Sequence, residues 1–218
     1  MAIKKLKMLS LIFLVVIICI GVVTGCIPEE DNDQNNSPQI TPLSAEELEY
    51  FNGDEFFNGE YMNIRNQFIS SLYDVPEEIN LFELFYCGSG FDEIPTEEER
   101  NAVVAHNNWD MEPDCACIKI SRINMDTVLI DNMGLIIADT EKIDLECFTY
   151  LKQYDSYYLY HGDTNYRMNI FFFDGEREGN IIRLFYDDEF MGEGEKVLTL
   201  REYGETYLFV SNQKSAVL

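Results

Sequence analysis

The sequence predicts an α+β fold in which short N-terminal helices pack on a C-terminal antiparallel β-meander of about five or six strands. Signals for helix starts and ends gather before residue 134, and short β-branched and aromatic runs separated by Gly, Asp and Asn follow from residue 148. A hydrophobic content of 46% indicates that the chain can bury a core of its own. We therefore expect one globular domain over residues 44–218.

The domain is expected to follow a linker. Residues 26–43 hold acids, Asn, Gln, Ser and prolines with almost no periodic apolar residues, which is typical of a flexible segment. Ser44 and Glu47 then have the spacing of a capping box, in which the two side chains satisfy free amides at a helix start. Leu48 and Phe51 supply the apolar edge of this first helix.

Three further segments of the first half have apolar or helix-start patterns. Residues 64–73 place apolar side chains at helical spacing, whereas residues 81–86 are a short apolar run compatible with helix or strand. A second capping box, formed by Thr96 and Glu99, predicts a helix that ends near Asn107.

The clearest helix follows Ser121, which is placed as an N-cap, and ends at Gly134, which suits the C-terminal cap. Its buried stripe is expected to comprise Ile123, Met125, Val128, Leu129 and Met133.

The second half has the texture of an antiparallel sheet. Turns from Asp174-Gly175 to Gly179-Asn180 and near Tyr203-Gly204 suit hairpins. Six runs are predicted as strands, at residues 148–153, 156–161, 168–173, 181–186, 196–201 and 206–211.

The first 25 residues read as an export signal, with lysines at positions 4, 5 and 7 before the uncharged apolar stretch Leu9 to Val23. Val23-Thr24-Gly25-Cys26 resembles the lipobox of bacterial lipoproteins. This resemblance implies diacylglycerol on the Cys26 sulfur, cleavage after Gly25 and an anchor in the cell membrane. An uncleaved membrane-spanning helix is the alternative, and both readings place the domain outside the cytoplasm.

The chain is strongly acidic, with 40 Asp and Glu against 15 Lys and Arg. Loss of the three signal lysines takes the formal charge from -25 to -28. Such a surface repels phosphate backbones, so a nucleic-acid partner is excluded, and it also repels anionic lipid headgroups. The partners that remain are a small ligand, a glycan, an envelope protein or a cation.

Four cysteines lie in the predicted domain: Cys87, Cys115, Cys117 and Cys147. Their number permits two disulfides, and the sequence leaves open whether any forms. Cys115 and Cys117 share a face if their segment is extended, and His106 or another cysteine would complete a zinc site. The spacing is poor for zinc, so half-buried thiols or a disulfide are favoured.

His161 and Asp163 form the most site-like pair, because an imidazole beside a carboxylate can act as a base or bind a ligand. A polar turn over Gly162 to Asn165 explains the same residues more simply. No G-x-S-x-G nucleophile motif is present. The acids at 174–178 and 187–189 are read as solvated turns, although they would also suit calcium.

Part of the domain has a resemblance of its own. Tyr157-Tyr158, the segment His161 to Tyr166 and the closing Tyr207 to Ser211 look like stretches in uncharacterised lipoproteins of anaerobic bacteria. The resemblance implies a lipoprotein and no activity.

The function that these observations favour is a non-enzymatic, membrane-tethered binding module that needs no cofactor. One alternative is an extracytoplasmic hydrolase that uses His161 and nearby acids. Another is a metal-binding protein that uses Cys115 and Cys117.

Overall fold

The computed structural model describes residues 39–58, 63–91, 93–162, 170–187 and 194–215. The chain divides into two units, Met1–Ser37 and Pro38–Leu218, and every described residue belongs to the second. The predicted export signal, Cys26 and Asp163 lie outside the described residues.

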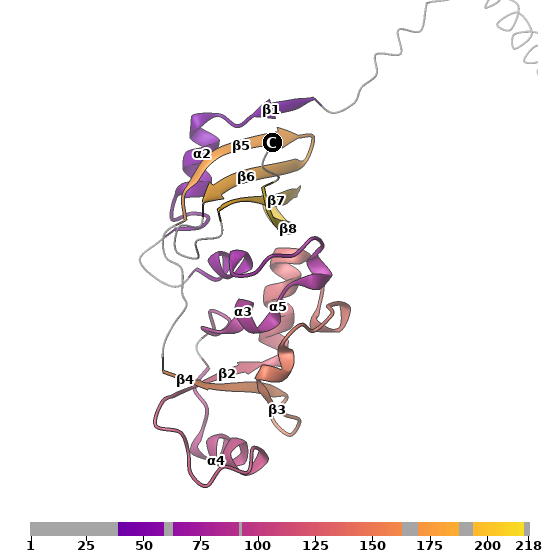
Figure 1. Cartoon of the computed structure of the whole chain (residues 1–218). Helices are drawn as coiled ribbons and strands as arrows, with labels where there is room; N and C mark the ends of the chain where they lie inside the picture. Colours follow the sequence, from indigo (N-terminus) through magenta and orange to yellow (C-terminus); the bar gives the residue numbers. More distant parts are fainter. Residues whose placement is uncertain (1–38, 59–62, 92, 163–169, 188–193, 216–218) are drawn as a thin grey trace, which may run out of the picture. The chain divides into compact units, whose positions relative to one another are not determined.

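The described strands form two antiparallel sheets, which we call sheet A and sheet B (Figure 1). Sheet A has the order β1-β5-β6-β7-β8, with β1 at Ile40–Pro42, β5 at Phe172–Glu178, β6 at Ile181–Asp187, β7 at Glu195–Tyr203 and β8 at Thr206–Lys214. Sheet B has the order β2-β4-β3, with β2 at Ala116–Ser121, β3 at Thr149–Leu151 and β4 at Ser156–His161.

The helices of the described residues are short and precede β3. The α-helices are α2 at Ala45–Asn52, α3 at Leu81–Phe85, α4 at Glu97–His106 and α5 at Arg122–Met133. The other helical segments described are 3₁₀ helices: η1 at Ile64–Ile69, η2 at Pro76–Glu78, η3 at Ile137–Asp139 and η4 at Leu145–Cys147.

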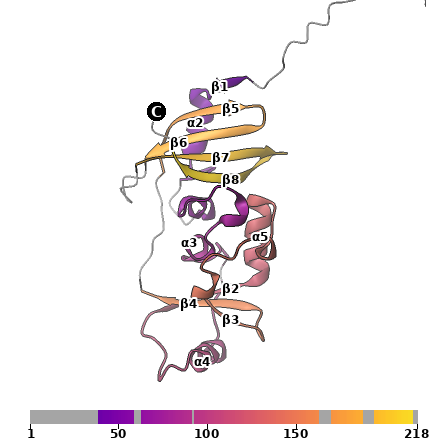
Figure 2. The same cartoon turned by 45° about the vertical axis from the view of Figure 1, so that its right-hand side comes forward.

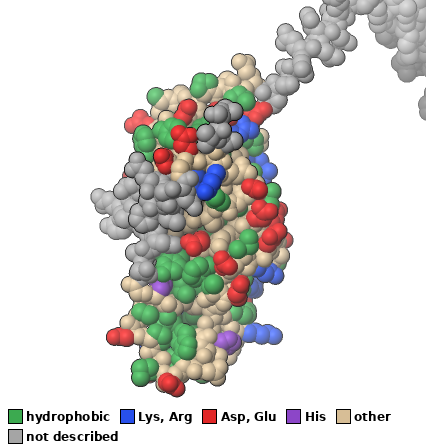
Figure 3. Space-filling view, viewed as in Figure 1, with side chains coloured by type: hydrophobic (Ala, Val, Ile, Leu, Met, Phe, Trp, Pro, Cys, Tyr) green, Lys and Arg blue, Asp and Glu red, His purple; other side chains and the backbone are tan. Residues whose placement is uncertain are grey.

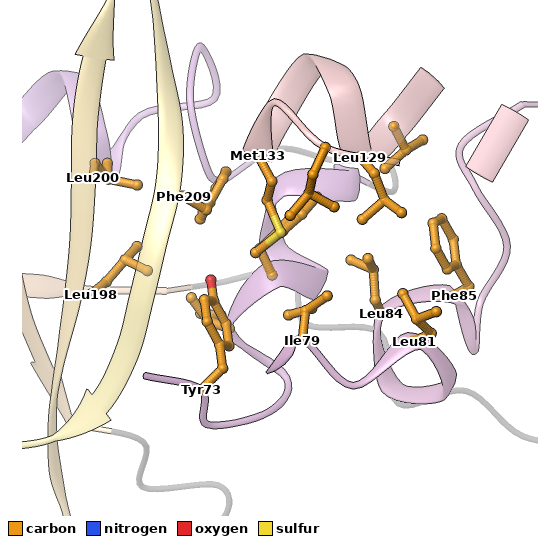
Figure 4. Packing of buried hydrophobic residues seen from close by; sticks show 14 of the residues in the cluster. Tyr73, Ile79, Leu81, Leu84, Phe85, Leu129, Met133, Leu198, Leu200 and Phe209 are labelled. Carbon is orange, nitrogen blue, oxygen red and sulfur yellow. The ribbon is translucent and has the colours of Figure 1, made fainter. Parts of the chain in front are cut away.

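A continuous apolar core joins the two sheets through the helices between them. In both views α3 and α5 lie between sheet A and sheet B, and α4 lies on the far side of sheet B (Figures 1 and 2). Figure 4 shows Leu198 and Phe209 of sheet A directed toward Met133 of α5. Phe209 also stacks on Phe68 of η1, with ring centroids 4.5 Å apart. Burial of each such side chain stabilises the fold by roughly 1.5–3 kcal/mol.

The α+β fold with a C-terminal antiparallel sheet of five strands is confirmed, and a smaller three-stranded sheet accompanies it. In sheet B, β4 pairs with β2 on one side and with β3 on the other, while β5 to β8 form a meander in sheet A. β2 was not predicted, because its six residues run directly into the cap of α5 and carry only two aliphatic side chains, Ile118 and Ile120. All six residues of β2 pair with β4, from Ala116↔His161 to Ser121↔Ser156, and this pairing holds β2 in sheet B.

The end of the predicted linker is a strand. Ile40 to Pro42 pair with Glu178 to Glu176 of β5, and the Leu43 amide donates to the Gly175 carbonyl at 2.8 Å. Gly175 therefore lies inside β5 and not in the turn expected at Asp174-Gly175. An ideal Cβ on Gly175 would lie 2.6 Å from Leu43 Cδ1, so a side chain at this position would displace the side chain of Leu43.

The helix predictions have mixed outcomes. Both capping boxes are confirmed, at Ser44 with Glu47 and at Thr96 with Glu99. The segment expected as a helix over residues 64–73 forms only the 3₁₀ turn η1, and residues 81–86 are resolved in favour of helix.

The prediction for α5 is largely correct. Gly134 caps it in the left-handed conformation at φ 75°. Four members of the expected stripe are buried, but Ile123 is 64% exposed, and the Ser121 side chain makes no capping bond.

Candidate functional site

A buried carboxylate joins α4 to sheet B. Glu99 is the third residue of α4 and is only 3% exposed. Its Oε1 accepts the Tyr158 hydroxyl at 2.8 Å and faces Lys119 Nζ at 2.7 Å, and its Oε2 accepts the Thr96 amide at 2.7 Å. Burial alone would raise the pKa of Glu99, but Lys119, the Thr96 amide and Tyr158 together lower it to about 2. The carboxylate is therefore a structural anion that orients α4.

The far end of α4 presents the single tryptophan of the chain. Asn107 caps the helix, and its Nδ2 donates to Thr149 Oγ1 at 2.9 Å, which links the helix end to β3. Asn108 adopts a positive φ of 54°, and the Trp109 amide donates back to Val104 O at 3.1 Å. This reversal leaves the Trp109 ring 41% exposed beside sheet B.

Tyr160 of β4 packs against the Trp109 ring. The two rings meet edge to face, with centroids 5.6 Å apart. The Tyr160 hydroxyl donates to Glu112 Oε1 at 2.9 Å, and Arg100 Nε pairs with the same oxygen at 2.8 Å. Burial and the bond to Glu112 raise the pKa of Tyr160, so its hydroxyl stays protonated. Both rings are thus held in position before any ligand arrives.

A hollow of about 380 Å³ opens beside these rings, and we call it the Trp109 hollow. Its lining comes from the end of α4 and the segment after it, with His106, Asn107 and Trp109, and from the segment that runs from η4 into β3 and from β4, with Glu146, Cys147, Phe148, Thr149, Tyr150, Tyr158, Leu159 and Tyr160. In the view of Figure 3, apolar side chains gather over the lower half of the molecule, which is built from α3, sheet B and α4.

The hollow lies where β3 ends before it has paired with the full length of β4. β2 pairs with the whole of β4, but β3 pairs only from Thr149 to Leu151. Cys147 and Phe148 instead donate their amides to the carbonyls of Asp144 and Leu145 within η4. Beyond Tyr158, β4 therefore borders on the hollow where a third strand would continue.

The chemistry of the hollow suits binding more than covalent catalysis. It combines flat aromatic faces with the polar side chains of His106, Asn107, Glu146 and Thr149. Its thiol is Cys147, whose pKa is raised by burial and by the neighbouring Asp144 and Glu146. A thiol that stays protonated at neutral pH is a poor nucleophile.

The predicted pair of His161 and Asp163 is not brought together by described residues, since Asp163 lies outside them. His161 ends β4 and is half-buried, with its ring 4.5 Å from the ring of Tyr86. Because neighbours in a strand point to opposite faces, His161 faces away from Tyr160 and the hollow. The hydrolase alternative, which needs acids around His161, therefore stays a prediction.

The four cysteines of the domain are free thiols. Cys115 is exposed, and burial raises the pKa of Cys117 to about 11, which opposes the thiolate that zinc requires. Within the described ranges, no three or more His, Cys, Asp or Glu side chains are arranged to hold a metal ion. The metal-binding alternative therefore has no support in this part of the chain.

The acidic turn considered for calcium is engaged in ion pairs. Glu176 and Glu178 lie in β5 and pair with Arg183 of β6, at 3.1 and 2.9 Å. They act as cross-strand charge pairs and not as free ligands.

Sequence reasoning missed Trp109 and Tyr160. The available signal was a lone tryptophan in the polar segment from Asn107 to Asp114, where no apolar periodicity calls for a buried side chain. Tyr160 carried no signal of its own, because aromatic residues in strands are usually core.

Among the described residues, no helix combines the length and hydrophobicity needed to cross a lipid bilayer. Comparisons with known protein families, with curated proteins and with solved structures find no match for this chain.

Proposed function

We propose that this protein is a membrane-tethered, extracytoplasmic binding module, and that the Trp109 hollow binds a neutral glycan. The observation that carries the proposal is the pair of fixed, partly exposed rings at Trp109 and Tyr160, set beside polar side chains in a hollow of about 380 Å³. Ligand sites of proteins have volumes of roughly 300–1,000 Å³ and combine aromatic surface with a few polar groups.

A sugar ring matches this arrangement in shape and chemistry. Its C–H face packs on an aromatic ring, and its hydroxyls can exchange hydrogen bonds with His106, Glu146 and Thr149. The acidic surroundings, with Glu146 exposed in the hollow and a chain charge of -25, disfavour anionic glycans.

The tether rests on the sequence around Cys26. Two acyl chains on that cysteine would hold the protein stably, because one chain alone gives only marginal binding. Such an anchor would keep the hollow close to the glycans of the cell envelope.

Trp109 provides the test, because it is the only tryptophan of the chain and its fluorescence reports on the hollow alone. The protein without residues 1–25 and with Cys26→Ser is titrated with cello-, chito- and malto-oligosaccharides. We expect a saturable fluorescence change with one class, and a loss of about tenfold in affinity for Trp109→Ala in calorimetry.

Tyr203→Ala is the matched control, since it also removes a large aromatic side chain, 67% exposed, at the β7–β8 hairpin. Its affinity should equal that of the unmodified protein. If no oligosaccharide changes the fluorescence, or if Trp109→Ala binds as well as the control, the glycan proposal is wrong.

A further inference from the structure

A second and larger cavity, of about 730 Å³, lies between the end of α5 and the β7–β8 hairpin. Met133 and Leu208 form its buried floor, at 4% and 6% exposure, and Ile130 extends the apolar surface outward. Gly134 ends α5 so close to the hairpin that an ideal Cβ there would lie 3.6 Å from Leu208 Cδ1. We call this space the α5 cavity.

The register of the β7–β8 hairpin places the positively charged Arg201 beside the apolar floor of the α5 cavity. Arg201 is the direct partner of Leu208, and Tyr203 is the partner of Thr206. Directly opposed residues of an antiparallel pair point to the same face, so all four side chains line the cavity together. The alternate residues Glu202 and Tyr207 face the other way.

Two charged side chains line the cavity, and both are unpaired in the described part of the chain. Arg201 and Asp131 are exposed, and neither side chain has a hydrogen bond or an ion pair in the described part of the chain. The remaining arginines of the described ranges all hold such a partner: Arg65, Arg100, Arg122, Arg177 and Arg183. An unpaired arginine stands out in a chain with 40 acids.

From this geometry we infer that the α5 cavity binds a small apolar zwitterion, either a free amino acid or a short peptide. Arg201 receives its carboxylate, Asp131 receives its ammonium group, and the apolar side chain packs on Met133 and Leu208. An anion alone would leave Asp131 opposed to it, and a cation alone would leave Arg201 unpaired. The site is separate from the Trp109 hollow and does not depend on it.

The test uses calorimetry on the full chain in a non-ionic detergent. The probes are L-leucine and L-leucyl-L-leucine, compared with 4-methylpentanoate, 3-methylbutylamine and glycine. These last three lack the ammonium group, the carboxylate and the apolar side chain in turn. We expect saturable binding of at least one zwitterion and at least tenfold weaker binding of all three analogues. The tighter of the two zwitterions identifies the source, amino acid or peptide.

Two variants locate the site. Arg201→Gln and Asp131→Asn should each weaken binding of the zwitterion by about tenfold or more, because each removes one charge-assisted contact. Lys152→Gln and Asp110→Asn are the matched controls, since both residues are exposed and lie away from the cavity. Trp109→Ala should also leave this binding unchanged.

Absence of binding by both zwitterions would overturn the inference. Equal binding of 4-methylpentanoate or 3-methylbutylamine would overturn it too, and this result needs only the unmodified protein. Equal losses in the variants and their controls would move the site elsewhere.

Discussion

At the scale of single residues, Glu99 shows how a charged side chain can be stabilising inside a protein. It is buried, yet it accepts bonds from a lysine, a tyrosine and a backbone amide. Its pKa of about 2 lies below the ordinary value of 4.5, so the carboxylate stabilises the folded state above pH ~4.5. That contribution is lost as the pH falls from about 4.5 toward 2.

We expect Glu99→Gln to lower the free energy of unfolding at neutral pH by roughly 1–3 kcal/mol, because Lys119 loses its buried partner. Between pH ~4.5 and ~2 the variant should lose less stability than the unmodified protein. Urea denaturation followed at several pH values measures both effects.

Glu97→Gln is the control, because Glu97 lies in the same first turn of α4 but is exposed. Its cost should stay within about 0.3–1 kcal/mol. Equal costs for the two variants, or an unchanged acid dependence for Glu99→Gln, would mean that the buried contacts contribute nothing.

At the scale of elements, β1 shows how a three-residue strand is held in a sheet. It pairs with β5 and forms the edge of sheet A, and Leu43 then covers Gly175, which has no side chain. Leu43 Cγ lies only 3.2 Å, and the Arg183 carbonyl 3.3 Å, from the position of an ideal Cβ. A methyl group at position 175 would therefore force the Leu43 side chain to move.

Gly175→Ala should lower the free energy of unfolding by roughly 1–3 kcal/mol, because the new methyl group overlaps Leu43. Leu43→Ala removes the obstacle, so the double variant should cost less than the sum of the two single variants by roughly 0.5–2 kcal/mol. Chemical denaturation of the four proteins gives this coupling energy.

Thr41→Ala, in the exposed middle of β1, serves as the control partner for Gly175→Ala. That pair should be additive. Additivity of Gly175→Ala with Leu43→Ala as well would show that β1 is not packed against this glycine.

At the scale of the whole molecule, the proposed tether sets where the domain would act. With the signal lysines removed, the chain would carry a formal charge of -28 and would repel anionic lipid, so in the proposed arrangement the attachment comes from Cys26 and not from the domain surface.

We expect Cys26→Ser to abolish labelling by radioactive palmitate and to slow removal of the signal. The unmodified protein should partition into a detergent phase and lose residues 1–25, which intact mass spectrometry measures. A full-length, unlabelled protein that stays in the membrane in the unmodified form would instead support an uncleaved membrane-spanning helix.

The sequence by itself determined those features that depend on neighbours a few residues apart. The capping boxes at Ser44 and Thr96, the glycine cap of α5 and the hairpin strands β6 to β8 were predictable, because each is formed by residues that lie close together in the sequence. The α+β class follows from the order in which these local patterns occur.

Only the tertiary structure decided which strands pair and where cavities open. β1 pairs with β5, which lies more than 130 residues away in the sequence. β4 pairs with β2, so β3 and β4 belong to a different sheet from the meander. The Trp109 hollow, and the unpaired Arg201 and Asp131 of the α5 cavity, depend on such pairings. Distant partners are selected by the total burial that they permit, and no short stretch of sequence encodes that sum.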